Sequence, residues 1–271
     1  MVDPELEVLD PAVKGTLNVL KVCSASKVQK LVVLSSNAAV DFNPNWPQDI
    51  LKDESCWSDK EYCKKNGNWY CVAKIVAEEA ALEYVDKNGL NVVTLCPPLV
   101  LGPLLQPTVN TSSKFLIYVI KGGPDTLTNK LWHIVDVRDV ADALLLLYEK
   151  KESSGRYICS PNHIRTRDLV ALLKMYPKYN YVDNILDVDP KASLTCQKLM
   201  DLGWEPRTLE ETQGQCRMLR EGRRSPGCRR ASLPSSPSLA YGWCSVTTHL
   251  RWRGAVFSTL RPSFFSELSS E

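Results

Sequence analysis

Two short apolar runs, residues 30–35 (KLVVLS) and 91–96 (NVVTLC), each follow a segment in which apolar side chains repeat at helical spacing. The helical segments cover residues 11–27 and 69–88, and Gly89 stands at the position where a helix often ends. Aliphatic and β-branched runs without polar alternation are typical of strands buried on both faces. Because helices alternate with such strands, the sequence predicts an α/β fold with a doubly wound, Rossmann-like parallel sheet.

Further segments continue this alternation and predict a smaller α+β lobe after the sheet. Asp136, Arg138 and Asp139 are expected to cap a helix and form ion pairs, and His133 is expected to be structural or to line a pocket. The long loop 43–67 holds Trp46 and Trp57, which either line an aromatic pocket with Trp69 or pack within the loop. The remaining predicted elements are strands at 131–137, 156–159 and 179–182, and helices at 137–149 and 167–175.

The carboxyl-terminal segment differs in composition from the rest of the chain. Residues 214–271 contain nine Arg and three acidic residues, and no Lys, Asp, Asn or Ile. We expect a low-complexity, basic, disordered tail over 213–271, which either was never selected as protein sequence or binds nucleic acid or acidic lipids. No RNA-binding motif accompanies the arginines, so no nucleic-acid partner is expected.

The sequence predicts a cytoplasmic protein without a membrane span or a metal site. The amino terminus lacks the cationic and apolar regions of a signal peptide, and apolar runs such as Ala143 to Tyr148 are too short to cross a bilayer. Ten cysteines form no C-x-x-C pair and are expected to be reduced, mostly buried thiols. Cys63 and Cys71 stand on either side of Tyr70, either as two free thiols or as a reversible bridge.

Three polar residues are candidates for proton transfer. Tyr70 and Lys74 lie four positions apart at the start of a predicted helix, which places both side chains on one helix face. A neighbouring ammonium favours the phenolate over the phenol. Ser36 follows the first predicted strand, and its hydroxyl can hold a substrate oxygen against the tyrosine. The trio indicates an enzyme that adds or removes hydride at a carbonyl or carbinol carbon.

With these motifs the chain resembles plant cinnamoyl-CoA reductases and their dihydroflavonol-reductase-like relatives, which are extended short-chain dehydrogenase/reductases. The similarity covers about residues 1–212. The stretches that carry it are DPAVKGTLNVLKVC (10–23), KLVVLSSNAAV (30–40), DESCWSD (53–59), KNGNWYCVAKIVAEEAALEY (65–84), PPLVLGPLLQPTVNTSS (97–113), HIVDVRDVADALLLLYE (133–149) and GRYICS (155–160).

The resemblance implies an NADP-dependent reductase of a phenylpropanoid-type CoA thioester, aldehyde or ketone. It makes Ser36, Tyr70 and Lys74 catalytic, with Tyr70 as the proton donor. It implies a partial NAD(P)-binding domain over 1–150 and a substrate lobe over 151–212 together with parts of 97–130. The residues that it implies for cofactor binding are Ser35, Lys74, Pro97, Pro98, Leu99 and Val100.

The chain departs from the family pattern in two places. Cinnamoyl-CoA reductases proper read N-W-Y-C-Y-G-K, whereas Val72 and Ala73 stand here, which favours an aldehyde or ketone over a CoA thioester. Before position 100 the sequence has only Gly15, Gly67 and Gly89, so it contains no glycine-rich phosphate-binding turn there. We therefore expect an amino-terminally truncated member that begins before the family's fourth helix.

Without the family's first strands, the strand at 30–35 would have a bare apolar edge, which is an aggregation or pairing liability. We expect the tail, a partner or a second copy of the chain to cover that edge. The alternative function is accordingly an inactive paralogue that binds a partner, for instance through this edge. The third hypothesis, a nucleic-acid binder, rests on the tail arginines alone.

Overall fold

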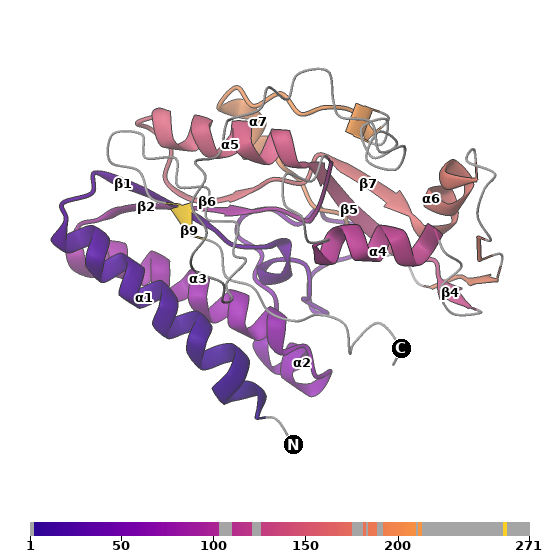
Figure 1. The fold of residues 1–271 in the computed structure, drawn as a ribbon, viewed down its shortest axis with the longest axis horizontal. Helices are drawn as coiled ribbons and strands as arrows, with labels where there is room; N and C mark the ends of the chain where they lie inside the picture. Colours follow the sequence, from indigo (N-terminus) through magenta and orange to yellow (C-terminus); the bar gives the residue numbers. More distant parts are fainter. Residues whose placement is uncertain are drawn as a thin grey trace, which may run out of the picture.

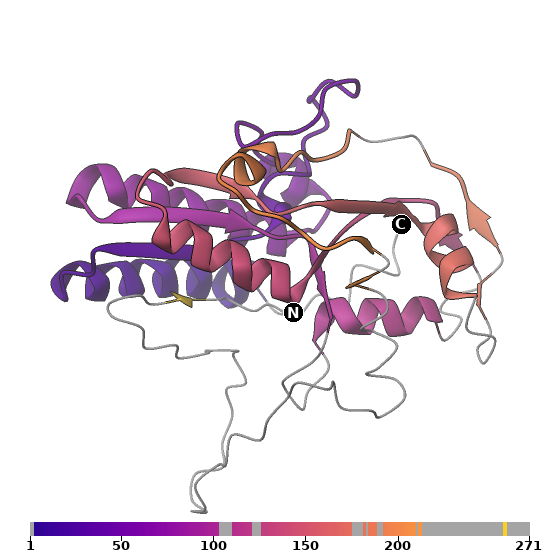
Figure 2. The same ribbon diagram turned by 90° about the horizontal axis from the view of Figure 1, so that it is seen from above.

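The computed structural model has an α/β fold in which helices pack on both faces of a central parallel sheet (Figures 1 and 2). The structure describes residues 3–102, 110–120, 126–174, 181–182, 184–188, 192–209, 211–212 and 257–258. The helices are α1 (Asp10–Ala25), α2 (Lys60–Lys65), α3 (Trp69–Asn88), α4 (Thr111–Ile120), α5 (Val137–Glu149), α6 (Thr166–Leu173) and α7 (Gln197–Asp201), with a π-helical turn η1 (Glu5–Leu9) and a 3-10 turn η2 (Asn37–Ala39).

The central sheet has the strand order β6-β2-β1-β9, and all its described pairs are parallel. A three-stranded sheet has the order β3-β5-β7, and β4 pairs with β8. The predicted α/β class with a parallel sheet is therefore confirmed. The strands are β1 (Lys30–Leu34), β2 (Asn91–Cys96), β3 (Leu99–Leu101), β4 (Leu127–Thr128), β5 (Leu131–Asp136), β6 (Gly155–Ile158), β7 (Asn162–Arg165), β8 (Ile185–Leu186) and β9 (Phe257–Ser258).

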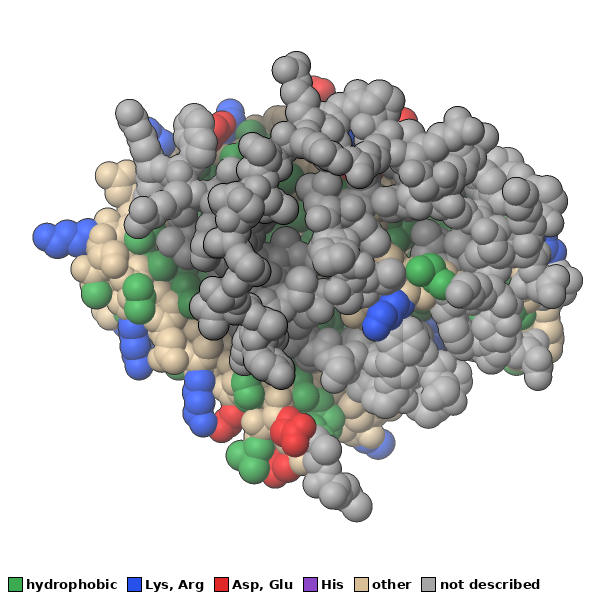
Figure 3. Space-filling model, in the orientation of Figure 1, with side chains coloured by type: hydrophobic (Ala, Val, Ile, Leu, Met, Phe, Trp, Pro, Cys, Tyr) green, Lys and Arg blue, Asp and Glu red, His purple; other side chains and the backbone are tan. Residues whose placement is uncertain are grey.

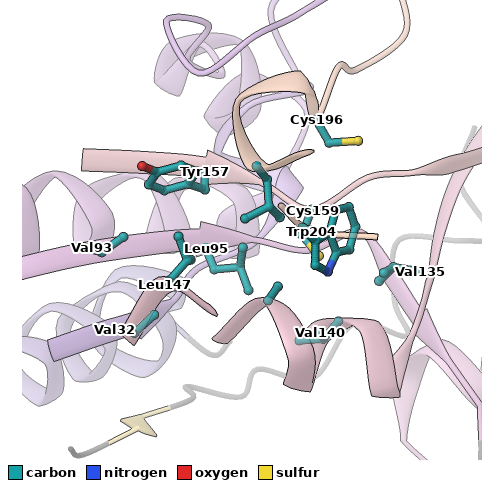
Figure 4. Close-up of a cluster of buried hydrophobic side chains, with 12 residues drawn as sticks. Val32, Val93, Leu95, Val135, Val140, Leu147, Tyr157, Cys159, Cys196 and Trp204 are labelled. Atoms are coloured by element: carbon teal, nitrogen blue, oxygen red, sulfur yellow. The ribbon is translucent and has the colours of Figure 1, made fainter. Parts of the chain in front are cut away.

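Both faces of β1 are covered, as its continuous apolar sequence predicts. Leu31 packs with Leu20 of α1 and Ala81 of α3 on one face. Val32 packs with α5, including Leu147, on the other face. Figure 4 shows this second cluster, in which side chains from the strands meet α5. Each fully buried leucine or valine side chain contributes about 1.5–3 kcal/mol relative to an exposed one, so the two clusters fix the helices to the sheet.

The helix α3 begins and ends where its sequence predicts. The Asn68 side chain accepts a hydrogen bond from the Cys71 backbone N–H at 3.0 Å, which caps the first turn. At the other end Gly89 has a φ of 68°, and its N–H bonds to the Val85 carbonyl. The helix α1 differs from prediction at its start. It begins at Asp10, one residue before the predicted start at position 11, and Asp10 pairs with Lys14 at 2.5 Å.

Some elements were not predicted because their sequence signals are short. The helix α2 lies inside the loop expected over 43–67, and β3 follows two prolines that were expected to end the strand before it. The helix α4 and the strand β7 were likewise missed. Of the strand expected over 179–182, residues 179–180 lie outside the described residues, and the other two belong to no strand.

The edge of β1 that faces away from β2 is partly covered. There Val32 and Val33 of β1 pair in parallel with Phe257 and Ser258 of β9. This is one of the three coverings that the sequence led us to expect, and it involves two of the positions of β1. The rest of the segment 213–271 lies outside the described residues.

The described surface on the side shown in Figure 3 carries single, scattered Lys and Arg side chains instead of one basic patch. Acidic side chains lie among them near the lower rim. In the described part of the chain, no helix combines the length and apolarity that a bilayer crossing requires. The same residues contain no cluster of three or more His, Cys, Asp and Glu side chains suited to a metal ion.

Candidate functional site

Ser36 is the second residue after β1 and caps the start of the turn η2. Its backbone is extended, and its Oγ accepts a hydrogen bond from the Ala38 N–H at 3.2 Å. The side chain is 8% exposed. The strand thus delivers Ser36 to the carboxyl end of the parallel sheet, where open α/β sheets bind their ligands.

Tyr70 and Lys74 occupy successive turns at the start of α3. The Lys74 Nζ lies 5.8 Å from the centroid of the Tyr70 ring. Lys74 is 8% exposed and Tyr70 is partly buried. The predicted side-by-side placement on one helix face is therefore present. An ammonium over an aromatic ring at this distance is attracted to the ring and stabilises nearby negative charge.

The amino-terminal turns of α3 are joined to η2, which brings Tyr70 and Ser36 into one region. The Cys71 Sγ donates to the Ala38 carbonyl at 2.8 Å. Ala38 and Ala39 pack in one cluster with Cys71, and Tyr70 packs against that cluster. Cys71, which follows Tyr70, is thus hydrogen-bonded to Ala38, which lies two residues after Ser36.

The two adjacent serines have different partners. The Ser35 Oγ donates to Glu78 Oε2 of α3 at 2.6 Å. Ser36 has no such bond to α3 among the described residues, and its hydroxyl stays at the start of η2. Ser35 is thus held under α3, whereas the Ser36 hydroxyl lies at the start of η2.

The segment that the resemblance implies for the nicotinamide end lies beside Ser36. The Pro97 carbonyl accepts a hydrogen bond from the Asn37 N–H at 2.9 Å. Pro97 and Pro98 are buried, and Leu99 is partly buried at the start of β3. The start of the segment 97–100 therefore lies next to the turn that follows Ser36.

Among the described residues, Lys74 has the chemistry to contact one end of a nicotinamide cofactor. Lys74, Ser35, Glu78 and Thr16 line a hollow of about 30 Å³, which has room for a water molecule or two. The Lys74 ammonium beside it is a suitable donor to a ribose hydroxyl. For the pyrophosphate the fit fails, because the sequence has no glycine-rich turn before position 100 and α1 begins with an acidic residue.

The structure shows two charged residues that the sequence reasoning missed. Glu78, 1% exposed, pairs with Arg156 Nε at 2.9 Å. Glu78 also accepts from Thr94 Oγ1 at 2.6 Å, in addition to Ser35. Glu78 stands four positions after Lys74, so the helical spacing that relates Tyr70 to Lys74 could have identified it.

Several other sequence candidates have structural partners. His133 is buried, and its Nδ1 lies 3.1 Å from Ser160 Oγ. Asp136 caps α5 through the Arg138 N–H at 2.8 Å, as predicted. Trp57 packs with its ring face against the Arg156 guanidinium, 3.5 Å from the ring centroid, so it serves packing in the loop.

The Cys63 and Cys71 side chains are both buried thiols, with their Sγ atoms 2.8 Å apart. Hydrogen bonding from Cys63 and burial raise the pKa of the Cys71 thiol. The seven cysteines of the described residues are all buried.

Comparisons with known proteins give a consistent family. Residues 2–159 match the profile of the NAD dependent epimerase/dehydratase family. The chain is 42% identical over 208 residues to cinnamoyl-CoA reductase 1 of Petunia hybrida, a match that covers 75% of this chain and 62% of that protein. With cinnamoyl-CoA reductase 1 of Arabidopsis thaliana the identity is 41%, over 75% of this chain and 60% of that protein.

Solved structures with similar folds include vestitone reductase from alfalfa (Medicago sativa L.), with 30% identity and a TM-score of 0.68 over 82% of this chain and 74% of that one. The yeast methylglyoxal/isovaleraldehyde reductase Gre2 complexed with NADPH has 26% identity and a TM-score of 0.70, again over 82% and 74% of the two chains. The present chain spans about three fifths of the length of the curated cinnamoyl-CoA reductases that it matches.

Proposed function

Because the chain belongs to the NAD dependent epimerase/dehydratase family, we propose that it is an NADP-dependent reductase of a phenylpropanoid-type carbonyl compound. The observation that carries the proposal is the bond between Cys71 of α3 and Ala38 of η2, which supports a shared site for Tyr70, Lys74 and Ser36. The substrate is a CoA thioester, an aldehyde or a ketone with an aromatic side group.

When bound, NADPH would supply the hydride that reduces the carbonyl carbon, and Lys74 would hold its ribose. Ser36 donates a hydrogen bond to the carbonyl oxygen and orients it toward the tyrosine. The Tyr70 phenol gives its proton to that oxygen as charge develops there. The Lys74 ammonium stabilises the resulting phenolate and binds a ribose hydroxyl. An aldehyde or ketone then leaves as the alcohol, whereas a CoA thioester gives a hemithioacetal that collapses to the aldehyde and the free thiol.

The departures from the cinnamoyl-CoA reductase pattern lie inside the protein. Val72 and Ala73 are 0% and 2% exposed, and Val72 packs in the cluster under α3. Val72 and Ala73 therefore influence the choice of substrate through packing and not by direct contact. An assay therefore compares all three classes with the same protein: cinnamoyl-CoA, cinnamaldehyde and an aromatic ketone.

The test combines cofactor binding with turnover. NADPH binding is measured by calorimetry, and turnover is followed by the loss of NADPH absorbance. The variant Tyr70→Phe should lower kcat by about 10²–10⁴-fold, the usual contribution of a general acid, with NADPH affinity unchanged. The control Tyr62→Phe changes a tyrosine that is 37% exposed on α2 and should leave turnover as it is. No NADPH binding at millimolar concentration would refute the proposal.

A second candidate function is that of a partner-binding protein without turnover. The edge of β1 supports it, since only Val32 and Val33 pair with β9 among the described residues. An exposed parallel edge accepts a further strand. Sedimentation of the purified chain separates the two, because a concentration-dependent dimer without NADPH binding favours the second candidate.

A further inference from the structure

The side chains at 70, 74 and 78 form a stripe along α3, and its last member is a buried carboxylate. The first two members are the proposed proton-transfer pair. Glu78 lies one turn further along, and its carboxylate is hydrogen-bonded to groups of the sheet. Its oxygens accept hydrogen bonds from Ser35 of the segment after β1, Thr94 of β2 and Arg156 of β6. One carboxylate thus joins the helix to three neighbouring strands.

The register of the sheet explains how one carboxylate reaches them all. Thr94 and Arg156 are direct partners in the parallel pair of β2 and β6. The Ser35 N–H bonds to the Leu95 carbonyl at 2.8 Å, which places Ser35 next to this row. Side chains at alternate positions share a face, so these three polar groups point to the same side of the sheet as α3.

Arg156 extends the same network to the far side of Ser36. Its Nη1 donates to the carbonyls of Glu54 and Cys56 at 3.0 Å and 2.9 Å, and its Nη2 donates to the Ala39 carbonyl at 3.4 Å. Ala39 ends the turn η2, which Ser36 begins. Ser35 on one side of Ser36 is therefore held by Glu78, and the end of the turn on the other side is held by Arg156.

This arrangement exceeds what packing alone requires. Removing two charges from water is costly, and well-packed apolar residues often replace a buried ion pair without loss of stability. Here both partners are at least nine-tenths buried, and each has several hydrogen bonds. Networks whose members are all satisfied specify one arrangement of the groups that they join.

We propose that Glu78 and Arg156 are positioning residues that hold Ser36 and the Tyr70–Lys74 helix in register for proton transfer. The inference rests on the proposed function for its catalytic consequence, but its structural content stands without turnover. Neither residue touches the reacting atoms. Glu78 acts through its hydrogen bond to Ser35, and Arg156 acts through its bond to η2. The ion pair between them fixes the position of α3 relative to the sheet.

The test uses Glu78→Gln, which keeps the shape of the side chain and removes its charge. The matched control is Asp139→Asn. Asp139 is also a fully buried carboxylate paired with an arginine, Arg207, but it lies on α5, on the other face of the sheet. Both variants remove the charge of a fully buried carboxylate that has an arginine partner, although Arg207 is 32% exposed and Arg156 only 7%. A general loss of stability therefore affects both.

The first readout is hydrogen exchange of the amides of η2 and the residue after it, at 38–40. These amides bond to Ser36 Oγ, Ser36 O and Asn37 O. Their exchange should become faster in Glu78→Gln and stay unchanged in Asp139→Asn. The second readout is kinetic: kcat should fall by about 10- to 100-fold in Glu78→Gln, with NADPH affinity and KM little changed, because misplaced groups cost rate at this scale.

Unchanged exchange at 38–40 in folded Glu78→Gln would overturn the proposal, and so would an equal loss of kcat in Asp139→Asn. If Glu78→Gln does not fold, Ser35→Ala carries the same test, since it removes only the hydroxyl that links Glu78 to the serine segment. If the wild-type chain shows no turnover, the proposed function fails and the exchange result alone decides the positioning role.

Discussion

Replacing Arg156 by methionine should destabilise the protein more than any loss of a surface charge. Arg156 is 7% exposed at its side chain and its partner Glu78 is 0% exposed. Removing one partner of such a pair leaves an uncompensated buried charge, which costs about 3–5 kcal/mol of unfolding free energy. For a fold of this size each kcal/mol lowers Tm by about 2–4 °C, so the expected decrease is about 6–20 °C.

The loss of stability in Arg156→Met has two sources, and a double-mutant cycle separates them. Part of the loss is the stacking on Trp57 and the hydrogen bonds to the loop carbonyls, which disappear with Arg156 whatever stands at position 78. The rest is the coupling to Glu78, which the double variant Glu78→Gln, Arg156→Met no longer contains. We expect the double variant to be more stable than the sum of the single losses predicts, by about 1–3 kcal/mol.

Urea unfolding followed by circular dichroism measures the four free energies. The control is Lys87→Met, which breaks an exposed pair with Glu83 and should change stability by no more than about 0.5 kcal/mol. The reasoning is refuted if Arg156→Met unfolds within 1 kcal/mol of wild type. It is also refuted if the two single losses add to the double loss within about 0.5 kcal/mol, because the pair would then be uncoupled.

Three further predictions concern other described sites. Gly102→Ala should destabilise by about 1–3 kcal/mol in thermal unfolding, because Gly102 has a φ of +126° and an added Cβ would lie 3.0 Å from Val137 Cγ1. Burial lowers the pKa of His133 to about 4, so between pH 6.5 and 4 the unfolded state binds a proton that the folded state does not. Up to about 3 kcal/mol of stability should therefore be lost as the pH falls through that window. The variant His133→Gln should lack this loss when unfolding is measured as a function of pH. Cys63 and Cys71 should resist alkylation in the native state and react after unfolding, as peptide mass spectrometry can show, since both are buried and the pKa of Cys71 is raised.

The sequence predicts the core elements of the fold because their signals are continuous. The run at 30–35 is apolar at almost every position, and it has this pattern because α1 and α3 cover one face and α5 covers the other. The helix at 69–88 has a capping asparagine before it and a glycine after it. Such signals lie within the element itself, and local reasoning can find them.

The missed elements have their cause elsewhere in the chain. The three residues of β3 form a strand because β5 pairs with them at Leu99, Val100 and Leu101. The strand β7 likewise owes its register to β5, with His133 opposite His163. Tertiary pairing of this kind overrides weak local preference, and a single sequence does not display it.

The residues of the candidate site also differ in whether a local sequence signal identifies them. Ser36, Tyr70 and Lys74 were found because fixed spacing on a helix and a position after a strand are local features. Arg156 was missed because its partner is 78 positions away. Nothing near Arg156 in sequence distinguishes it from an exposed arginine, and only the sheet register brings it under α3.

The groups that anchor the trio also show which parts of the proposed chemistry are separable. Ser36 is fixed through Ser35, which follows β1, and through Glu78 of α3 and Arg156 of β6, on the β2 side of β1. None of these contacts uses the opposite edge of β1, where β9 pairs. The geometry for proton transfer is therefore expected to persist whatever covers that edge. The described contacts do not supply a binding site for the cofactor pyrophosphate. Protected amides at 38–40 together with weak NADPH binding is thus a coherent outcome, because the contacts that hold 38–40 include no binding site for the pyrophosphate.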